Sequence, residues 1–381
     1  MINPTFFPPD FIIAHFISRP NRFVVRILID KKETGASLPN PGKLGELFIP
    51  GARLYVQRMS AEVKYSYRVI AVESLSGEVI MLDTHTNNRI AEYLINSAFI
   101  PSLKGYHVKK REVTVGHSRF DLLLENVSGE LLYCEVKSCT LFGGRLAMFP
   151  DAITSRGKRH VEELGKMALS GIKTAVVFVI QSANIQYFSP DYHTDILFSE
   201  TLYKYRKQIK IIPVRAGWNN RLELNVSEGE VPLLWDLYEK EGRSGGGFII
   251  MLFNIPEEKN IPMDLMGNLQ LSTGYYIYIS YESEELKSRA EKYKRIRKKC
   301  RNFTDYLRRD SLLDMLWIIR TGSEKIDLIN HSILQISHGM IQHDSSSRLY
   351  YFRENPRLMR DFQELLLDLK MRIPLIDILG E

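Results

Sequence analysis

The sequence predicts an α/β protein of several domains: a small N-terminal β-barrel, a central domain of alternating strands and helices, and a separate C-terminal domain. The chain has 381 residues, more than one compact hydrophobic core usually holds. Its composition, 44% apolar and 25% charged, is ordinary for a globular protein and argues against wholesale disorder. The segment GRSGGG at 242–247 has the composition of a flexible linker and divides the chain.

Residues 1–84 predict the barrel. Short apolar runs that read as strands stand at 23–30, 52–59, 65–72 and 79–83, and a turn-rich segment, PNPGKLGELFIPG, fills 39–51. Closely spaced strands with glycine and proline between them are typical of a small barrel. An oligonucleotide-binding (OB) type of barrel is the expectation, although other small barrels share this periodicity.

Residues 85–235 predict the α/β domain. Helical spacing is found at 89–98, 154–170 and 199–208, and strands are expected at 107–115, 119–125, 131–136, 174–180 and 209–214. The run TAVVFVI at 174–180 is continuously apolar, which indicates a strand covered on both faces.

Residues 246–381 predict the third domain. Strands are expected at 248–254 and 275–280. A long helix is expected at 284–301, with Ser283 as its N-cap and Glu284 and Glu285 in its first turn.

The composition also suggests where the protein works. Cys134, Cys139 and Cys300 form no C-x-x-C pair and no even disulfide framework, which suits a reducing cytosol. No apolar run reaches the roughly 20 residues needed to cross a bilayer, and the N-terminus lacks the basic region of a secretory signal. We therefore expect a cytoplasmic protein with no membrane partner. The net charge of +6 is too mild to indicate a partner by itself.

One stretch carries a candidate catalytic site. RFDLLLENVSGELLYCEVKS at 119–138 reads as a β-hairpin whose turn contains Gly129. Glu135 and Lys137 project from one face of their strand. A hairpin centred on Ser128 places Asp121 opposite Glu135, and a register slip of one residue would separate them.

Two converging carboxylates suit a hard cation such as Mg²⁺ or Mn²⁺, which would be bound by Asp121 and Glu135. Lys137 beside the ion would position water and stabilise charge on a phosphoryl group. This D…E-x-K pattern is the arrangement needed for metal-assisted phosphodiester hydrolysis. The alternative is a solvated Glu–Lys face on an ordinary strand.

Basic residues near this stretch are candidates for nucleic-acid contacts. They comprise Arg119 and four residues at the start of the predicted helix: Arg156, Lys158, Arg159 and His160. Positive charge at a helix N-terminus opposes the helix dipole, so its presence there makes sense if a phosphate binds too. The alternative is a solvated basic turn.

Several blocks in order resemble the sugar fermentation stimulation protein family. These blocks are PNPGKLGELFIPGA, SRFDLLLE, YCEVKSCTL and FPDAITSRGKRHVEEL, and the resemblance covers roughly residues 10–225. It implies an OB-like barrel followed by a PD-(D/E)XK restriction-endonuclease-like domain, DNA binding, and the nuclease motif at Asp121, Glu135 and Lys137. It does not imply demonstrated cutting.

Residues 247–352 more weakly resemble a GIY-YIG-related domain, through GYYIYIS, DYL and LYYF. Ile249 and Ser280 stand where that motif has tyrosine and glycine, so the resemblance implies a degenerate small α+β module that binds rather than cuts.

A basic run lies within the expected long helix of this domain. Seven of the ten residues at 292–301 are basic. Arg295, Lys298 and Lys299 are therefore candidate phosphate contacts on one helix face, with Tyr293 and Phe303 available to stack on bases. A merely solubilising face is the alternative.

The leading hypothesis is a DNA-binding protein, acting on double-stranded DNA, with a metal-dependent nuclease-type centre. A second hypothesis is a non-catalytic DNA-binding or regulatory protein that keeps the fold. A third, suggested by the family's name, is an RNA-directed or sugar-metabolism regulator.

Overall fold

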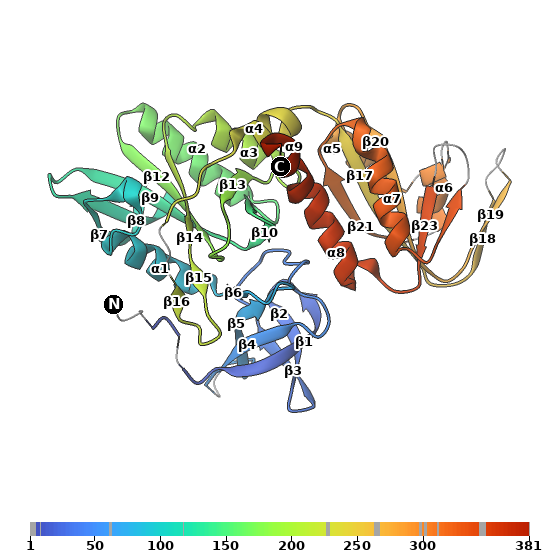
Figure 1. Cartoon of the computed structure of the whole chain (residues 1–381), viewed down its shortest axis with the longest axis horizontal. Helices are drawn as coiled ribbons and strands as arrows, with labels where there is room; N and C mark the ends of the chain where they lie inside the picture. Colours follow the sequence, from blue (N-terminus) through green and yellow to red (C-terminus); the bar gives the residue numbers. More distant parts are fainter. Residues whose placement is uncertain are drawn as a thin grey trace. The chain divides into compact units, whose positions relative to one another are not determined.

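The computed structural model describes two compact units, Met1–Trp235 and Asp236–Glu381 (Figure 1). Within them the described residues are 5–7, 9–60, 63–116, 118–225, 229–262, 267–296, 299–300, 303–310, 312–342 and 348–380. None of the helices in these ranges is long and apolar enough to span a membrane. The three cysteines are free thiols, as expected.

The first unit begins with a closed barrel. Its strands are β1 (Ile12–Asn21), β2 (Val24–Ile29), β3 (Lys32–Ser37), β4 (Arg53–Arg58) and β5 (Tyr67–Glu73). Antiparallel pairings join β1 to β2 and β4, β2 to β3, and β4 to β5, and a parallel pairing of β3 with β5 closes the ring. Alternate residues of β2, namely Val25, Ile27 and Ile29, fill the barrel core. The predicted barrel is confirmed.

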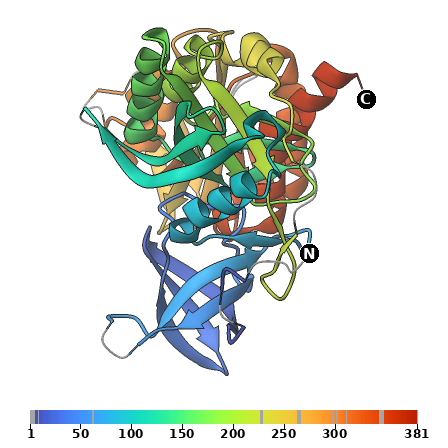
Figure 2. The same cartoon turned by 90° about the vertical axis from the view of Figure 1, so that its left-hand side faces the viewer.

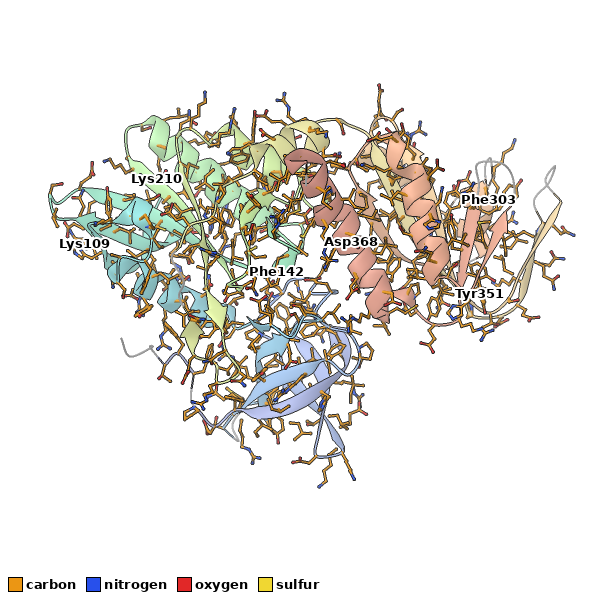
Figure 3. All side chains as sticks on the ribbon, viewed as in Figure 1. Lys109, Phe142, Lys210, Phe303, Tyr351 and Asp368 are labelled. Carbon is orange, nitrogen blue, oxygen red and sulfur yellow. The ribbon has the colours of Figure 1, made fainter. Side chains whose placement is uncertain are left out.

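The barrel sheet continues into strands from distant parts of the chain. β6 (Val79–Met81) pairs with β5, β15 (Gly217–Trp218) pairs with β6, and β16 (Leu224–Asn225) pairs with β15. Phe142, labelled in Figure 3, packs against both the barrel core and the core beneath the α/β sheet. The two parts of the first unit therefore share packing as well as a sheet.

The second part of the first unit is an α/β fold. Its central sheet has the order β14-β12-β9-β8-β7, from strands Lys210–Arg215, Lys173–Ile180, Leu131–Cys139, Ser118–Asn126 and Tyr106–Val115. β12 runs parallel to β9 and β14, whereas β7, β8 and β9 form an antiparallel meander. Lys109 and Lys210 mark the two edge strands in Figure 3. A smaller sheet is formed by β10 (Leu141–Gly143), β11 (Leu146–Phe149) and β13 (Tyr187–Pro190).

Helices cover both faces of the central sheet (Figure 2). α1 (Thr84–Asn96) packs on one face, while α2 (Ser155–Leu169) and α3 (Ile196–Lys204) pack on the other. Coverage on both sides explains why β12 is buried from Thr174 to Ile180. α2 begins where the Thr154 side chain accepts a hydrogen bond from the Gly157 amide, so the predicted helix at 154–170 is confirmed.

A short helical segment, α4 (Trp235–Leu237) continuing to Gly242, stands at the boundary between the units and precedes the glycine-rich stretch. The antiparallel sheet of the second unit has the order β21-β17-β20-β23-β22, from strands Leu312–Ile319, Gly247–Ile255, Gly274–Glu282, Arg348–Phe352 and Gly339–Gln342. β18 (Lys259–Pro262) and β19 (Asn268–Leu271) form a hairpin. α5 (Leu286–Tyr293) and α6 (Phe303–Asp310) cover one face of the sheet, and α7 (Ile326–Ile336), α8 (Arg360–Leu367) and α9 (Ile373–Leu379) follow on the other side.

The prediction of one long helix at 284–301 is wrong. α5 ends at Tyr293, and Arg295 already lies in a bend. Ser283 is not the N-cap: Glu285 takes that place in a left-handed conformation, with φ of 54°, and no side-chain hydrogen bond caps the described helix. Like charges three and four positions apart repel on a helix, which accounts for a helix that stops as the basic run begins.

Candidate functional site

The β8–β9 hairpin sets the spacing of the candidate site. The Asn126 side chain accepts hydrogen bonds from the backbone amides of Ser128 and Glu130, and Gly129 supplies the positive φ of 79° that the turn requires. The resulting register pairs Leu124 with Leu132 and Leu122 with Cys134. The hairpin is therefore centred on Ser128, as the sequence predicts.

The pairing of β7 with β8 is interrupted at Asp121. Glu112 and Asp121 do not pair, although the pairs on either side of them do, and Glu112 has a φ of 53°. Phe120 and Leu122 face opposite cores, whereas residues two apart in a regular strand share a face. Irregular pairing of this kind re-aims a side chain. Asp121 here accepts hydrogen bonds from the Val136 amide at 2.8 Å and from Asn88 Nδ2 on α1 at 2.9 Å.

Glu135 is the most deeply buried carboxylate of the site, at 2% exposure. Its Oε1 atom is 2.5 Å from Lys137 Nζ and 2.5 Å from His160 Nδ1. Its Oε2 atom is also buried and finds no hydrogen-bond partner within the described part of the chain. Burial raises the pKa of Glu135, but Lys137 and His160 outweigh burial, and the pKa lies below its ordinary value.

The two carboxylates differ in their electrostatics. Burial, followed by repulsion from Glu135, raises the pKa of Asp121 above its ordinary value, and its hydrogen bond from Val136 offsets this only in part. A carboxylate held ionised therefore lies beside one that ionises less readily. A divalent cation would favour the ionised form of both.

The structure places His160 in the buried site, at 2% exposure, and not at the surface as the expected basic contact at the start of a helix. It belongs to the buried stripe of α2 together with Gly157, Val161 and Leu164. Helical spacing is the sequence signal that could have predicted the burial of His160, because His160 stands four residues before the buried Leu164 and shares its helix face. The basic residues directly before it, Lys158 and Arg159, obscure that signal.

The residues of the site fit a hard divalent cation such as Mg²⁺. No cluster of three or more His, Cys, Asp or Glu side chains suited to a metal ion occurs among the described residues. The available donors are the carboxylates of Asp121 and Glu135, including the unpartnered Glu135 Oε2. Mg²⁺ is commonly held by one or two carboxylates and completes its shell with water and phosphate oxygens, so these residues fit such an ion.

The other predicted contacts in the first unit lie at the surface. Arg156 and Arg159 are exposed. Lys158 pairs with Glu162 at 3.4 Å, and Arg119 pairs with Glu112 at 3.6 Å. Exposed pairs of this kind are weak, so a phosphate could replace the carboxylate at small cost.

In the second unit, Arg295 and Lys299 are exposed, and Lys298 lies outside the described residues. Arg295 and Lys299 do not share a helix face, since α5 ends before them. The expectation that Phe303 is available to stack on bases is wrong. Phe303, labelled in Figure 3, is 5% exposed, and its ring packs against Tyr278. Tyr293 donates a hydrogen bond to Glu282.

Two family models match the first unit. Residues 17–82 match the model described as the SfsA N-terminal OB domain, and residues 85–221 match the sugar fermentation stimulation protein RE domain. The two matches together cover more than half of the chain.

Individual relatives agree with these models. A sugar fermentation stimulation protein homolog of Methanosphaera stadtmanae is 40% identical over 54% of this chain and 87% of its own length. A homolog of Clostridium tetani is 38% identical over 51% of this chain and 84% of its own. The solved structure of Pyrococcus furiosus SfsA in complex with Ca²⁺ is 30% identical, with a TM-score of 0.55, over 59% of this chain and 96% of that one. The chain therefore belongs to the sugar fermentation stimulation protein family.

Proposed function

We propose that this protein binds DNA and carries a phosphodiesterase centre, dependent on Mg²⁺ or Mn²⁺, at Asp121, Glu135 and Lys137. The observation that supports it most is Glu135, a buried carboxylate of lowered pKa with one oxygen that no described group satisfies. Buried polar atoms are normally satisfied, and an exception calls for a ligand or an ion. The proposed centre is of the PD-(D/E)XK type.

Each residue has a distinct role in this proposal. Asp121 and Glu135 would hold the cation, which supplies Lewis-acid polarisation of a phosphate and a more acidic water when bound. The ammonium of Lys137, whose side chain is only 16% exposed, keeps Glu135 ionised and places positive charge where a phosphoryl group gains negative charge. The relative solved with Ca²⁺ supports a hard cation in this family.

Double-stranded DNA is the proposed substrate. Arg119, Arg156, Lys158 and Arg159 would contact phosphates, which supply most of the affinity in sequence-independent binding. The carboxylate partners of Arg119 and Lys158 are themselves exposed, and a phosphate could displace them at small cost.

The second unit is, in this proposal, a binding module with a degenerate GIY-YIG-like fold. Ile249 and Ser280, the positions that depart from that motif, are direct partners across β17 and β20. Ile249 is fully buried, so no hydroxyl is available there for proton transfer. Arg295, Lys298 and Lys299 would supply its phosphate contacts.

A second function, DNA binding without cleavage, is favoured by one specific observation. Both oxygens of Asp121 accept protein hydrogen bonds, and Glu135 Oε1 is shared by Lys137 and His160. Much of the site is thus satisfied by the protein alone, as in a structural charge cluster.

A cleavage assay separates the two functions. The full chain is incubated with supercoiled plasmid, linear duplex and single-stranded DNA, each with Mg²⁺, Mn²⁺ or EDTA. The proposal predicts cation-dependent cleavage of duplex DNA that disappears in Glu135→Gln. DNA binding without cleavage under any of these conditions would support the non-catalytic function instead.

A further inference from the structure

We propose that His160 is a positioning residue, which orients the Glu135 carboxylate so that Oε2 alone is presented to the cation. This inference rests on the proposed cation site. It assigns His160 a role through Glu135 rather than a direct contact with DNA.

The contacts of His160 carry this inference. Its Nδ1 atom lies 2.5 Å from Glu135 Oε1, the same oxygen that Lys137 approaches. Its ring packs edge-on against Phe120, with ring centroids 6.0 Å apart. The imidazole is therefore fixed by packing on one side and by a carboxylate on the other.

The hydrogen bonds also define the tautomer of His160. Nδ1 faces a carboxylate oxygen and so carries the proton, while Nε2 accepts a hydrogen bond from Arg156 Nε at 3.5 Å. A guanidinium can only donate, so Nε2 must be the acceptor in this contact. Arg156 on the helix surface thereby supports the orientation of the ring beneath it.

A second donor on Oε1 has a physical consequence. The terminal torsion of a glutamate is broad and roughly two-fold, so a carboxylate held only by a flexible lysine can exchange its two oxygens. A rigid imidazole fixed to the same oxygen opposes that rotation. Partners that orient a metal ligand in this way commonly change metal affinity by about 10- to 100-fold when removed.

The test measures Mn²⁺ binding to the full chain by calorimetry, without DNA. His160→Leu removes the donor at similar size, and His160→Asn keeps an N–H near the position of Nδ1. Lys166→Gln, an exposed position on the same helix, is the matched control. We expect Mn²⁺ affinity to fall about tenfold or more in His160→Leu, and to stay near wild type in His160→Asn and Lys166→Gln.

Three outcomes would overturn the inference in different ways. Unchanged affinity in His160→Leu, with wild-type protein binding Mn²⁺, overturns the role of His160 and leaves the cation site intact. Wild-type protein that binds no Mn²⁺ overturns the cation site and this inference with it. Equal loss in His160→Asn and His160→Leu overturns positioning through the N–H.

A further variant covers the case in which thermal melting shows that His160→Leu does not fold. His160→Gln then takes its place, because the longer glutamine places its amide nitrogen near the position of Nε2 and leaves Glu135 Oε1 with Lys137 but without the second donor. We expect His160→Gln to bind Mn²⁺ about tenfold more weakly than His160→Asn. Equal affinity of these two variants contradicts the inference.

Discussion

Two carboxylates, one in each unit, differ in how their oxygens are satisfied. In the second unit Glu282 Oε1 accepts hydrogen bonds from Tyr293 and Ser280, and Oε2 pairs with Arg289. In the first unit Lys137 and His160 both contact Oε1 of Glu135, and Oε2 meets no partner among the described residues. This difference supports the proposal that Glu135 binds a ligand and that Glu282 has a structural role.

Glu135 should matter far more to cleavage than Glu282. Glu135→Gln should reduce DNA cleavage by about 100-fold or more, because it removes the negative charge that holds the cation. DNA affinity should change little, since phosphate contacts elsewhere carry it. Glu282→Gln is the matched control and should cleave like wild type. Comparable losses in both variants, measured on one labelled duplex, would contradict the distinction.

The helix α2, which brings His160 to the site, packs closely against Tyr205 at Gly165. A β-carbon at Gly165 would lie 2.3 Å from the Tyr205 ring, so Gly165→Ala should destabilise the first unit by about 1–3 kcal/mol. Gly339→Ala in the second unit is the control, because a β-carbon there meets no described atom within 4 Å. Urea unfolding of the two variants gives the comparison. Equal stability of Gly165→Ala and wild type would show that α2 moves away without cost.

Asp121 and Glu135 repel each other when both are ionised, and this repulsion costs stability. Asp121→Asn removes a buried charge that repels Glu135, and Asn88 can turn its amide so that its oxygen accepts from the new NH₂ group. The substitution should therefore stabilise the protein at neutral pH without divalent cations.

The pH dependence of this gain follows from the raised pKa of Asp121. The native state binds the proton more tightly than the unfolded state, so ionisation costs stability, and that cost is complete only above the native pKa. The gain from Asp121→Asn should therefore shrink on acidification, as measured by urea unfolding at acid and neutral pH. A gain of the same size at both would contradict this account.

Surface arginines and lysines of both units are the proposed phosphate contacts. Each true phosphate contact contributes about 0.9 to the slope of log affinity against log salt on duplex DNA. We expect Arg156→Gln with Arg159→Gln, and separately Arg295→Gln with Lys299→Gln, to flatten that slope. Salt titrations of both double variants against one duplex measure how much each unit contributes to the phosphate contacts. An unchanged slope in either means that the unit concerned does not touch the DNA backbone through these residues.

Local signals in the sequence predict much of the fold and the spacing of the site. The turn residues Asn126 and Gly129 encode the hairpin register on which the expected placement of Asp121 near Glu135 depends. Thr154 and Ser170 mark the ends of α2, as the helix pattern indicates. These features depend on neighbours in the chain, which a single sequence displays.

Features that depend on distant contacts are not visible in the sequence. β3, with the sequence KETGAS, has one buried residue, Ala36, and so shows no strand pattern. The pairing of Trp218 with Val79 joins segments far apart in the chain. The contact of His160 with Glu135 likewise appears only after α2 packs on the sheet. The sequence pattern at 284–301 predicts one long helix, but that pattern does not include the repulsion among the basic side chains after Tyr293, where α5 ends.

Calorimetry of the full chain measures the Mn²⁺ stoichiometry of wild type, Glu135→Gln and Glu282→Gln, and so tests directly whether Glu135 holds a cation. We expect binding at the Glu135 site in wild type and in Glu282→Gln, and loss of that binding in Glu135→Gln. Wild-type protein that binds no Mn²⁺, or Glu135→Gln that binds it as tightly as wild type, would contradict a cation site at Glu135.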